Sequence, residues 1–229
     1  MLLHIPDVLD PAQLARMRTV LDTAEWIDGR ATVGVQGAQV KRNQQLDDHS
    51  LLRKQLGDMV LAALAASPLF HAATLPQRIL PPRFNRYQSG GEYGFHVDGA
   101  VMGATGNDGV AEQMRSDVSC TLFINEPDEY DGGELIISDT YGEHEVKLPA
   151  GDLIVYPSSS LHRVTPVVRG VRLASFFWVQ SLVRDGEQRG MLLDLDRSIQ
   201  SLTQTGAERE SVLRLTNLYH NLLRRWAET

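Results

Sequence analysis

The stretch that indicates the fold is DLIVYPSSSLHRVTPVVRGVRLASFFWVQS, residues 152–181. Its apolar run at 152–156 predicts a buried strand, and the longer run at 171–181 predicts another. His162 stands between the two runs, and we expect a turn near residues 166–170 that sends the chain back. The stretch is therefore typical of antiparallel β structure.

Other short β-rich runs precede this stretch and are separated by turn residues. They cover residues 83–88, 93–97, 117–125, 134–138 and 143–148, and a short strand is also expected within 2–8. Closely spaced strands of this kind favour a sandwich or a barrel. The Gly- and Ala-rich segment 99–115 is predicted to be a long loop and a candidate lid. Gly132-Gly133 is predicted to form a corner with positive φ.

Helical patterns occupy both ends of the chain. Asp10-Pro11 followed by Gln13 supplies an N-cap and a capping box, so a helix is predicted over residues 11–23. A second helix is predicted over 50–66, and both helices are expected to cover a sheet. Helical spacing returns near the C-terminus, at Val212, Leu215, Tyr219, Leu222 and Trp226.

The predicted fold class is therefore α+β, mainly β. Residues 1–181 form a β core with N-terminal covering helices, and residues 182–229 form a helical appendage. This appendage is also a candidate surface for a homo-oligomer, because an amphipathic helix can cover its own sheet or that of a partner.

Composition limits the classes of protein that fit. The 229 residues can bury a core without staples, and the single cysteine, Cys120, excludes an internal disulfide framework. A net charge of −7 without a basic stripe argues against nucleic acid as a partner. Neither a long apolar span nor a signal-peptide pattern stands out, so we expect a cytoplasmic protein that does not enter the membrane.

His96-Val97-Asp98 is the first motif whose spacing has a chemical use. Residues i and i+2 of a strand project from the same face, so an imidazole and a carboxylate at this spacing can bind one metal ion. His162 would complete the set. Two histidines and one carboxylate on one octahedral face leave the opposite positions open, as non-haem Fe(II) oxygenases require. A His-x-Asp motif by itself also occurs by chance, in histidines near turns.

Arg172, ten residues after His162, supplies a second and independent feature. Its guanidinium is a fixed fork that suits a carboxylate, and a strand returning from the turn would place it beside the metal. The distal carboxylate of 2-oxoglutarate needs such a partner, while its 2-oxo acid end chelates iron. The triad and the arginine would then hold the two ends of one molecule.

Several further motifs accompany the triad and the arginine. They are Arg86-Tyr87, Gly90-Gly91 and Tyr93 ahead of His96-x-Asp98, then Asp131-Gly132-Gly133-Glu134-Leu135, and finally Tyr156-Pro157-Ser158-Ser159-Ser160-Leu161-His162-Arg163-Val164 with Arg172. Together they resemble the PKHD-type hydroxylases, which are bacterial relatives of the prolyl 4-hydroxylases. The resemblance spans essentially the whole chain, and the run of serines before His162 makes it more specific than the triad alone.

This resemblance implies a double-stranded β-helix, or jelly-roll, core. It implies Fe(II) held by His96, Asp98 and His162, and 2-oxoglutarate held by Arg172, often with L-ascorbate as a reductant. The implied reaction hydroxylates a substrate and releases succinate and CO₂. The substrate, a small molecule or a protein side chain, stays open.

Two other positions follow from the same resemblance. Tyr87 matches a tyrosine that lines the co-substrate pocket in related prolyl hydroxylases, so we expect its hydroxyl to bind an oxygen of 2-oxoglutarate. Some relatives carry a second pocket tyrosine on the strand after the long loop, where Leu122 is expected in this chain. Which side chain helps Arg172 to bind the co-substrate is therefore left open.

Two alternative functions remain at this point. A non-catalytic jelly-roll sensor of iron or 2-oxoglutarate would use the same ligands without turnover. A hydrolase or isomerase of cupin type would use the metal as a Lewis acid and would need neither Arg172 nor O₂. Arg83 and Arg86 are equally open, either as contacts to an acidic substrate or as part of a solvated strand face.

Overall fold

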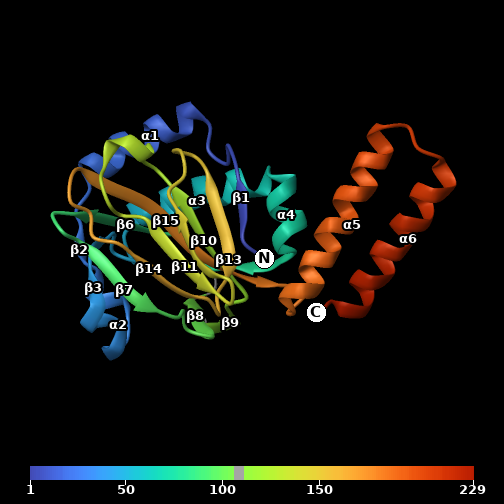
Figure 1. Cartoon of the computed structure of the whole chain (residues 1–229). Helices are drawn as coiled ribbons and strands as arrows, with labels where there is room; N and C mark the ends of the chain where they lie inside the picture. Colours follow the sequence, from blue (N-terminus) through green and yellow to red (C-terminus); the bar gives the residue numbers. More distant parts are fainter. Residues whose placement is uncertain (106–110) are drawn as a thin grey trace.

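The computed structural model describes residues 1–105 and 111–229, whose strands form two large antiparallel sheets and one hairpin (Figure 1). The larger sheet has the order β1 (Leu3–Ile5), β13 (Leu153–Pro157), β10 (Val118–Phe123), β15 (Val171–Ser181), β6 (Arg83–Gln88), β4 (Gln44–Gln45) and β2 (Ile27–Asp28), with β5 (Pro76–Ile79) beside β15. The smaller sheet has the order β12 (Gly142–Val146), β11 (Leu135–Asp139), β14 (Leu161–Val164), β7 (Glu92–His96) and β3 (Lys41–Arg42). The hairpin joins β8 (Val101–Thr105) to β9 (Ala111–Arg115).

Helices flank this β structure (Figure 1). They are α1 (Pro11–Asp22), α2 (Val35–Val40), α3 (Leu51–Ala65), α4 (Pro68–Thr74), α5 (Gly186–Gln204) and α6 (Arg209–Trp226), with 3-10 turns η1 (Gly29–Thr32) and η2 (Pro127–Glu129). The predicted class, helices with mainly strands, is confirmed. The predicted strands 83–88 and 171–181 have the observed bounds, and the other predicted elements differ by a few residues at their ends.

The predicted capping box starts α1. The Asp10 carboxylate accepts from the backbone N–H of Gln13 (2.8 Å), and the Gln13 side chain accepts from the backbone N–H of Asp10 (2.9 Å). These bonds satisfy two of the free N–H groups at the helix start, so the helix begins where the sequence indicates.

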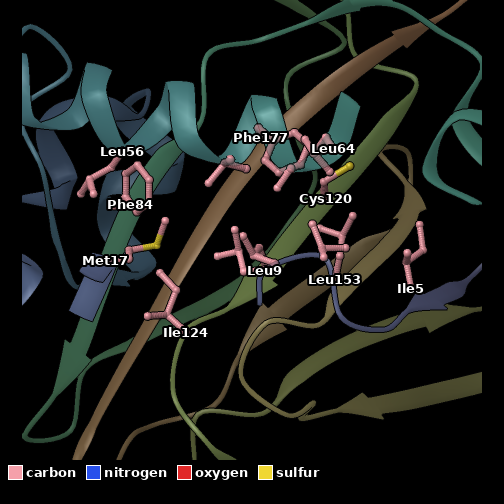
Figure 2. Close-up of a cluster of buried hydrophobic side chains, with 14 of the residues drawn as sticks. Ile5, Leu9, Met17, Leu56, Leu64, Phe84, Cys120, Ile124, Leu153 and Phe177 are labelled. Atoms are coloured by element: carbon pink, nitrogen blue, oxygen red, sulfur yellow. The ribbon is translucent and has the colours of Figure 1, made fainter. Parts of the chain in front are cut away.

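α1 and α3 cover one face of the larger sheet, as predicted. Met17 of α1 and Leu56 of α3 lie in one buried cluster with Phe177 of β15 (Figure 2). Strand side chains alternate between faces, so this cluster takes the odd-numbered residues of β15 and the even-numbered residues of β10. The other face of the sheet is left for a second layer.

The smaller sheet forms that second layer. Buried side chains from both sheets share a cluster, including Phe123 and Ile154 of the larger sheet and Leu135, Ile137 and Val164 of the smaller one. A cavity of about 680 Å³ lies between the sheets and is lined by residues of both. The fold thus encloses a site between two β layers.

The predicted loop 99–115 is largely a β-hairpin, so this prediction was wrong for the described part. Val101 pairs with Arg115 and Met102 with Met114, and Met114 is buried against Leu80 and Trp178. The small residues of this segment give no alternating apolar pattern that would indicate a strand. The burial of Met114 fixes the pairing of β8 with β9. Residues 106–110, where the proposed lid has its centre, lie outside the described residues.

The route from His162 to Arg172 also differs from expectation. β13 and β14 are separate strands in different sheets, and β15 belongs to the sheet opposite β14. His162 and Arg172 therefore face each other across the cavity instead of lying on adjacent strands. The connection at 165–170 crosses from one sheet to the other, which the local sequence pattern does not reveal.

The tail is helical, as predicted, and α5 and α6 pack side by side beyond the β layers (Figure 1). Leu192 of α5 is buried with Leu75 and Val183, and Trp226 of α6 packs against this cluster. In residues 1–105 and 111–229, no single helix is long and apolar enough to cross a membrane. Together, α3 and α4 have the length and composition of a bent membrane span, but they turn by 88° and both contribute to the core cluster, through Leu56, Leu64 and Phe70.

Gly132 and Gly133 form the predicted corner with φ of +74° and +72°. Gly133 meets a second constraint, because a Cβ there would lie 3.0 Å from Cδ of Arg172 and 2.8 Å from Cγ2 of Val167. The missing side chain therefore makes room for Arg172.

Gly133→Ala should lower the free energy of unfolding more than Gly90→Ala, as measured by urea denaturation. Both positions have positive φ, so both variants carry a backbone cost of about 1–2 kcal/mol. The added methyl group crowds its neighbours only at position 133, which should cost about 1–3 kcal/mol more, the usual range for overpacking. A Cβ at Gly90 meets nothing within 4 Å. Equal losses in the two variants would contradict the packing role of Gly133.

Candidate active site

The structure brings His96, Asp98 and His162 together in the cavity. Their ligand atoms lie within 4.8 Å of one another, and His162 Nε2 is 3.8 Å from Asp98 Oδ2. His96 and His162 are cross-strand partners of β7 and β14, with ring centroids 4.2 Å apart. A register shift between His162 and Val164 places a β irregularity beside the site, a feature that often re-aims side chains next to functional groups.

Both histidines present Nε2 to the shared space. His96 Nδ1 lies 2.9 Å from the Gly94 carbonyl oxygen, and His162 Nδ1 lies 3.0 Å from the Ser160 carbonyl oxygen. A carbonyl oxygen only accepts, so each Nδ1 carries the proton and each Nε2 keeps its lone pair. Burial first, and His162 second, lower the pKa of His96 to about 4. The ring is therefore neutral near pH 7, which is the form that binds a metal.

Asp98 is oriented by two buried serines. Ser119 Oγ lies 2.6 Å from Asp98 Oδ2 and 2.8 Å from Ser158 Oγ. A hydroxyl has one proton, so Ser119 donates to the carboxylate and Ser158 donates to Ser119. Such outer contacts fix ligand geometry at metal sites. Sequence reasoning missed Ser119, although Ser158 belongs to the serine run it singled out.

Arg172 lies on the opposite wall and is 1% exposed. Its Cζ lies 5.3 Å from the ring centroids of both Tyr87 and Phe123, and Tyr87 is its cross-strand partner on β6. Within the described residues, Nε and Nη1 of this guanidinium have no hydrogen-bond partner. A buried unpaired charge is costly, so the arrangement calls for an anion in the cavity.

Leu122 does not line the cavity. The prediction that it stands where some relatives carry a second pocket tyrosine was therefore wrong. Leu122 is fully buried beneath the helices, because β10 turns Ser119 and Thr121 toward the cavity and Leu122 away from it. A tyrosine near Arg172 comes from elsewhere. The ring of Tyr130 and Cδ of Arg172 both lie 3.0 Å from the Cβ position at Gly133, and the buried Tyr130 hydroxyl has no partner in the part of the chain described.

The two arginines left open by the sequence take different faces of β6. Arg83 lines the cavity and pairs with Asp48 (2.8 Å), with its Cζ 5.8 Å from the Trp178 ring. Arg86 points to the other face, where it borders a separate hollow. Only Arg83 is therefore placed to meet a molecule in the cavity.

The structure also adds a polar wall that sequence reasoning missed. Its members line the cavity and are buried: Lys41, Asn43, Gln45 and Asn85. Burial first, and Arg83 second, lower the pKa of Lys41 to about 8. Polar residues alternating at 41, 43 and 45 were the available signal, but such a pattern in a short segment equally describes a solvated loop.

Comparisons with known proteins agree with this geometry. A family model described as 2OG-Fe(II) oxygenase superfamily matches residues 82–180, and a model described as PKHD-type hydroxylase C-terminal domain matches residues 186–228. A PKHD-type hydroxylase of Stenotrophomonas maltophilia (strain R551-3) is 65% identical over 228 residues and covers 100% of each chain. One from Xylella fastidiosa (strain M12) is 64% identical over 230 residues, again with 100% of each chain covered.

The chain belongs to the PKHD-type hydroxylase family. It is accordingly a 2-oxoglutarate- and Fe(II)-dependent hydroxylase whose substrate is unidentified. Among solved structures, a prolyl-4-hydroxylase of Pseudomonas putida aligns with a TM-score of 0.50 and 24% identity, covering 79% of this chain and 92% of that one. A prolyl hydroxylase of Trichoplax adhaerens aligns with a TM-score of 0.54 and 15% identity, covering 79% and 83%. These likenesses concern the fold alone.

Ser119→Ala should weaken Fe(II) binding to this hydroxylase by about 10–100-fold, because Asp98 loses the donor that orients it. The affinity is measured anaerobically by competition with a chromophoric chelator. Ser159→Ala is the matched control, since Ser159 belongs to the same serine run but is exposed. A Ser119 variant that binds iron as tightly as this control would remove the orienting role.

Proposed function

We propose that His96, Asp98 and His162 hold the ferrous ion of this PKHD-type hydroxylase and that Arg172 binds the distal carboxylate of 2-oxoglutarate. The single observation that carries the proposal is the buried guanidinium of Arg172, which has no counter-charge among the described residues and lines the same cavity as the triad. Two imidazoles and one carboxylate also match the ligand preference of non-haem Fe(II).

The residues present fit both groups. Nε2 of each histidine keeps a lone pair for a metal, and the Arg172 nitrogens that have no partner in the described residues match a carboxylate. When bound, iron and 2-oxoglutarate supply the oxidising chemistry that converts O₂ and the co-substrate into succinate and CO₂ and a substrate C–H bond into an alcohol.

The protein contributes geometry to this reaction. The Nδ1 bonds to the carbonyls of Gly94 and Ser160 hold the imidazoles in one tautomer. The rings of Tyr87 and Phe123 flank Arg172, which supports a fixed plane for its guanidinium. We propose that the Tyr87 hydroxyl, which belongs to a cavity-lining residue, donates to a co-substrate oxygen.

The proposal includes finer statements. The two facing antiparallel sheets support a jelly-roll core, and residues 1–181 form the dioxygenase domain while residues 182–229 form its helical appendage. We further propose L-ascorbate as a reductant, a cytoplasmic location, a small-molecule or peptide substrate without nucleic acid or membrane partners, and contact between copies of the chain through α5 and α6.

Formation of succinate under air tests the reaction directly. The purified chain with Fe(II) and 2-oxoglutarate is incubated with candidate substrates, and succinate and oxygenated products are measured by mass spectrometry. A hydroxylase should form both succinate and the oxygenated product only when O₂ is present. Co-substrate consumption that is indifferent to O₂ would favour Lewis-acid chemistry, and ligand binding without turnover for every candidate would favour a sensor.

Arg172→Ala should weaken 2-oxoglutarate binding by about 1.5–3 kcal/mol, the range for a bond to a charged group, while Fe(II) stays bound. Both affinities are measured anaerobically by calorimetry. Arg169→Ala is the control, because Arg169 is exposed and pairs with Asp131. An Arg172 variant that keeps its 2-oxoglutarate affinity, or loses iron as well, would contradict the assignment.

A further inference from the structure

Three amides on the polar wall of the cavity have unused hydrogen-bonding atoms. Both amide atoms of Asn43, Nε2 of Gln45 and Oδ1 of Asn85 are buried without partners in the described structure. Gln45 and Asn85 are cross-strand partners on β4 and β6, so their side chains emerge side by side. An amide offers both a donor and an acceptor whichever way it is turned. This wall is built to meet a molecule rich in hydrogen-bonding groups.

Lys41 adds a charge to this wall. It is 3% exposed, and its ammonium donates to the Thr32 hydroxyl (3.1 Å) but forms no ion pair in residues 1–105 and 111–229. The ammonium also lies 5.1 Å from the ring centroid of Tyr93, whose ring stacks on His96 at 3.5 Å. Lys41 is therefore close to the iron ligands, on the sheet opposite Arg172.

Each of the other charged side chains that line the cavity in the described structure has either a partner or an assigned ligand. Arg83 pairs with Asp48 (2.8 Å), Asp98 belongs to the proposed metal site, and Arg172 is assigned to the co-substrate. Lys41 is then the cation left over when iron and 2-oxoglutarate are in place. Three carboxylates lie near enough to act on the Lys41 charge, and they are Asp48, Asp98 and Asp28. None of them forms an ion pair with Lys41 in the described structure. A buried ammonium without an ion-paired carboxylate favours an anionic ligand.

We propose that Lys41, Asn43, Gln45 and Asn85 form the substrate-recognition wall, and that the substrate is a polar small molecule whose carboxylate pairs with the Lys41 ammonium. This inference rests on the proposed function, because that function places 2-oxoglutarate at Arg172. The cavity of about 680 Å³ has the size of sites that enclose small molecules.

A purely structural role for Lys41 makes a different prediction. If its ammonium only supported the Tyr93 ring beside His96, substitution would disturb the site, but an added carboxylate would leave the Lys41 signal unchanged. The test must therefore observe the ammonium itself.

The chain contains three lysines, Lys41, Lys54 and Lys147, so the signals of ¹³C-labelled lysine side chains can be assigned with Lys54→Arg and Lys147→Arg variants. The full chain is loaded with Zn(II), a diamagnetic substitute for Fe(II), and with 2-oxoglutarate. It is then titrated with acetate and, in parallel, with the neutral analogue acetamide. Lys54 is the internal reference, since it is exposed and pairs with Asp58 (2.8 Å).

The Lys41 signal should shift saturably with acetate and stay in place with acetamide, while Lys54 does not respond to either probe. A Lys41 signal that stays in place with acetate, or that moves alike with both probes, overturns the inference. Failure of the proposed function appears separately as missing succinate in air, because the titration requires no turnover.

The substrate identified by the aerobic succinate screen allows a second test of this inference. It should be retained on an anion exchanger at pH 7, and Lys41→Met should lower its kcat/KM about tenfold or more, in line with loss of a charge-assisted bond. Lys41→Arg should restore part of the loss, and Lys54→Met should have no effect. A neutral substrate whose kcat/KM is the same in the Lys41→Met variant would overturn the inference.

Discussion

Successive side chains of a strand point to opposite faces, and this hydroxylase depends on the larger sheet using both of its faces. On β15, Leu173 and Phe177 pack beneath the helices, whereas Arg172 and Trp178 face the cavity. One strand thus stabilises the fold and carries the proposed co-substrate anchor. A register slip of one residue would exchange the two sets, placing a guanidinium in the apolar core and leucine in the site. Stability and chemistry are therefore coupled through the pairing of β15.

The two sheets divide the site between them. The smaller sheet and the residues that follow β7 supply His96, Asp98 and His162, and the larger sheet supplies Arg172 and Tyr87. A molecule that binds the metal at one end and a guanidinium at the other must span the gap between the layers. The burial of Arg172 suits this task, because a desolvated guanidinium discriminates strongly in favour of a carboxylate. Room for it comes from Gly133, whose missing Cβ leaves space for the Arg172 stem.

Short-range chemical patterns in the sequence predicted much of this arrangement. The i, i+2 spacing of His96 and Asp98, the strands 83–88 and 171–181, and the capping box at Asp10 depend on neighbouring residues, so they were visible. Sheet membership was not visible, because whether β14 pairs with β11 or with β15 is decided by partners far along the chain. Leu122 was assigned to the wrong face for a similar reason, since one residue of uncertainty in β10 reverses the direction of a side chain. The β8–β9 hairpin was missed because its small residues carry little strand signal, while the burial of Met114 decides its pairing.

The polar wall shows why recognition is harder to predict than chemistry. Arg172 and Tyr87 lie on strands paired at six positions, and His162 lies on β14, which pairs with β11 at four positions, so these side chains are fixed within narrow limits. Lys41 and Gln45 lie on β3 and β4, two-residue strands at or near the edges of their sheets. Such short segments are held by few ladder bonds, as their two residue pairs with β7 and with β6 show, so their local sequence pattern gives little indication of where their side chains lie. The architecture thus combines a reaction centre on well-paired strands with a wall that lies partly on short strands. The amide atoms of that wall without a partner, and its ammonium without an ion pair, in the described structure support the proposal of a polar, acidic ligand.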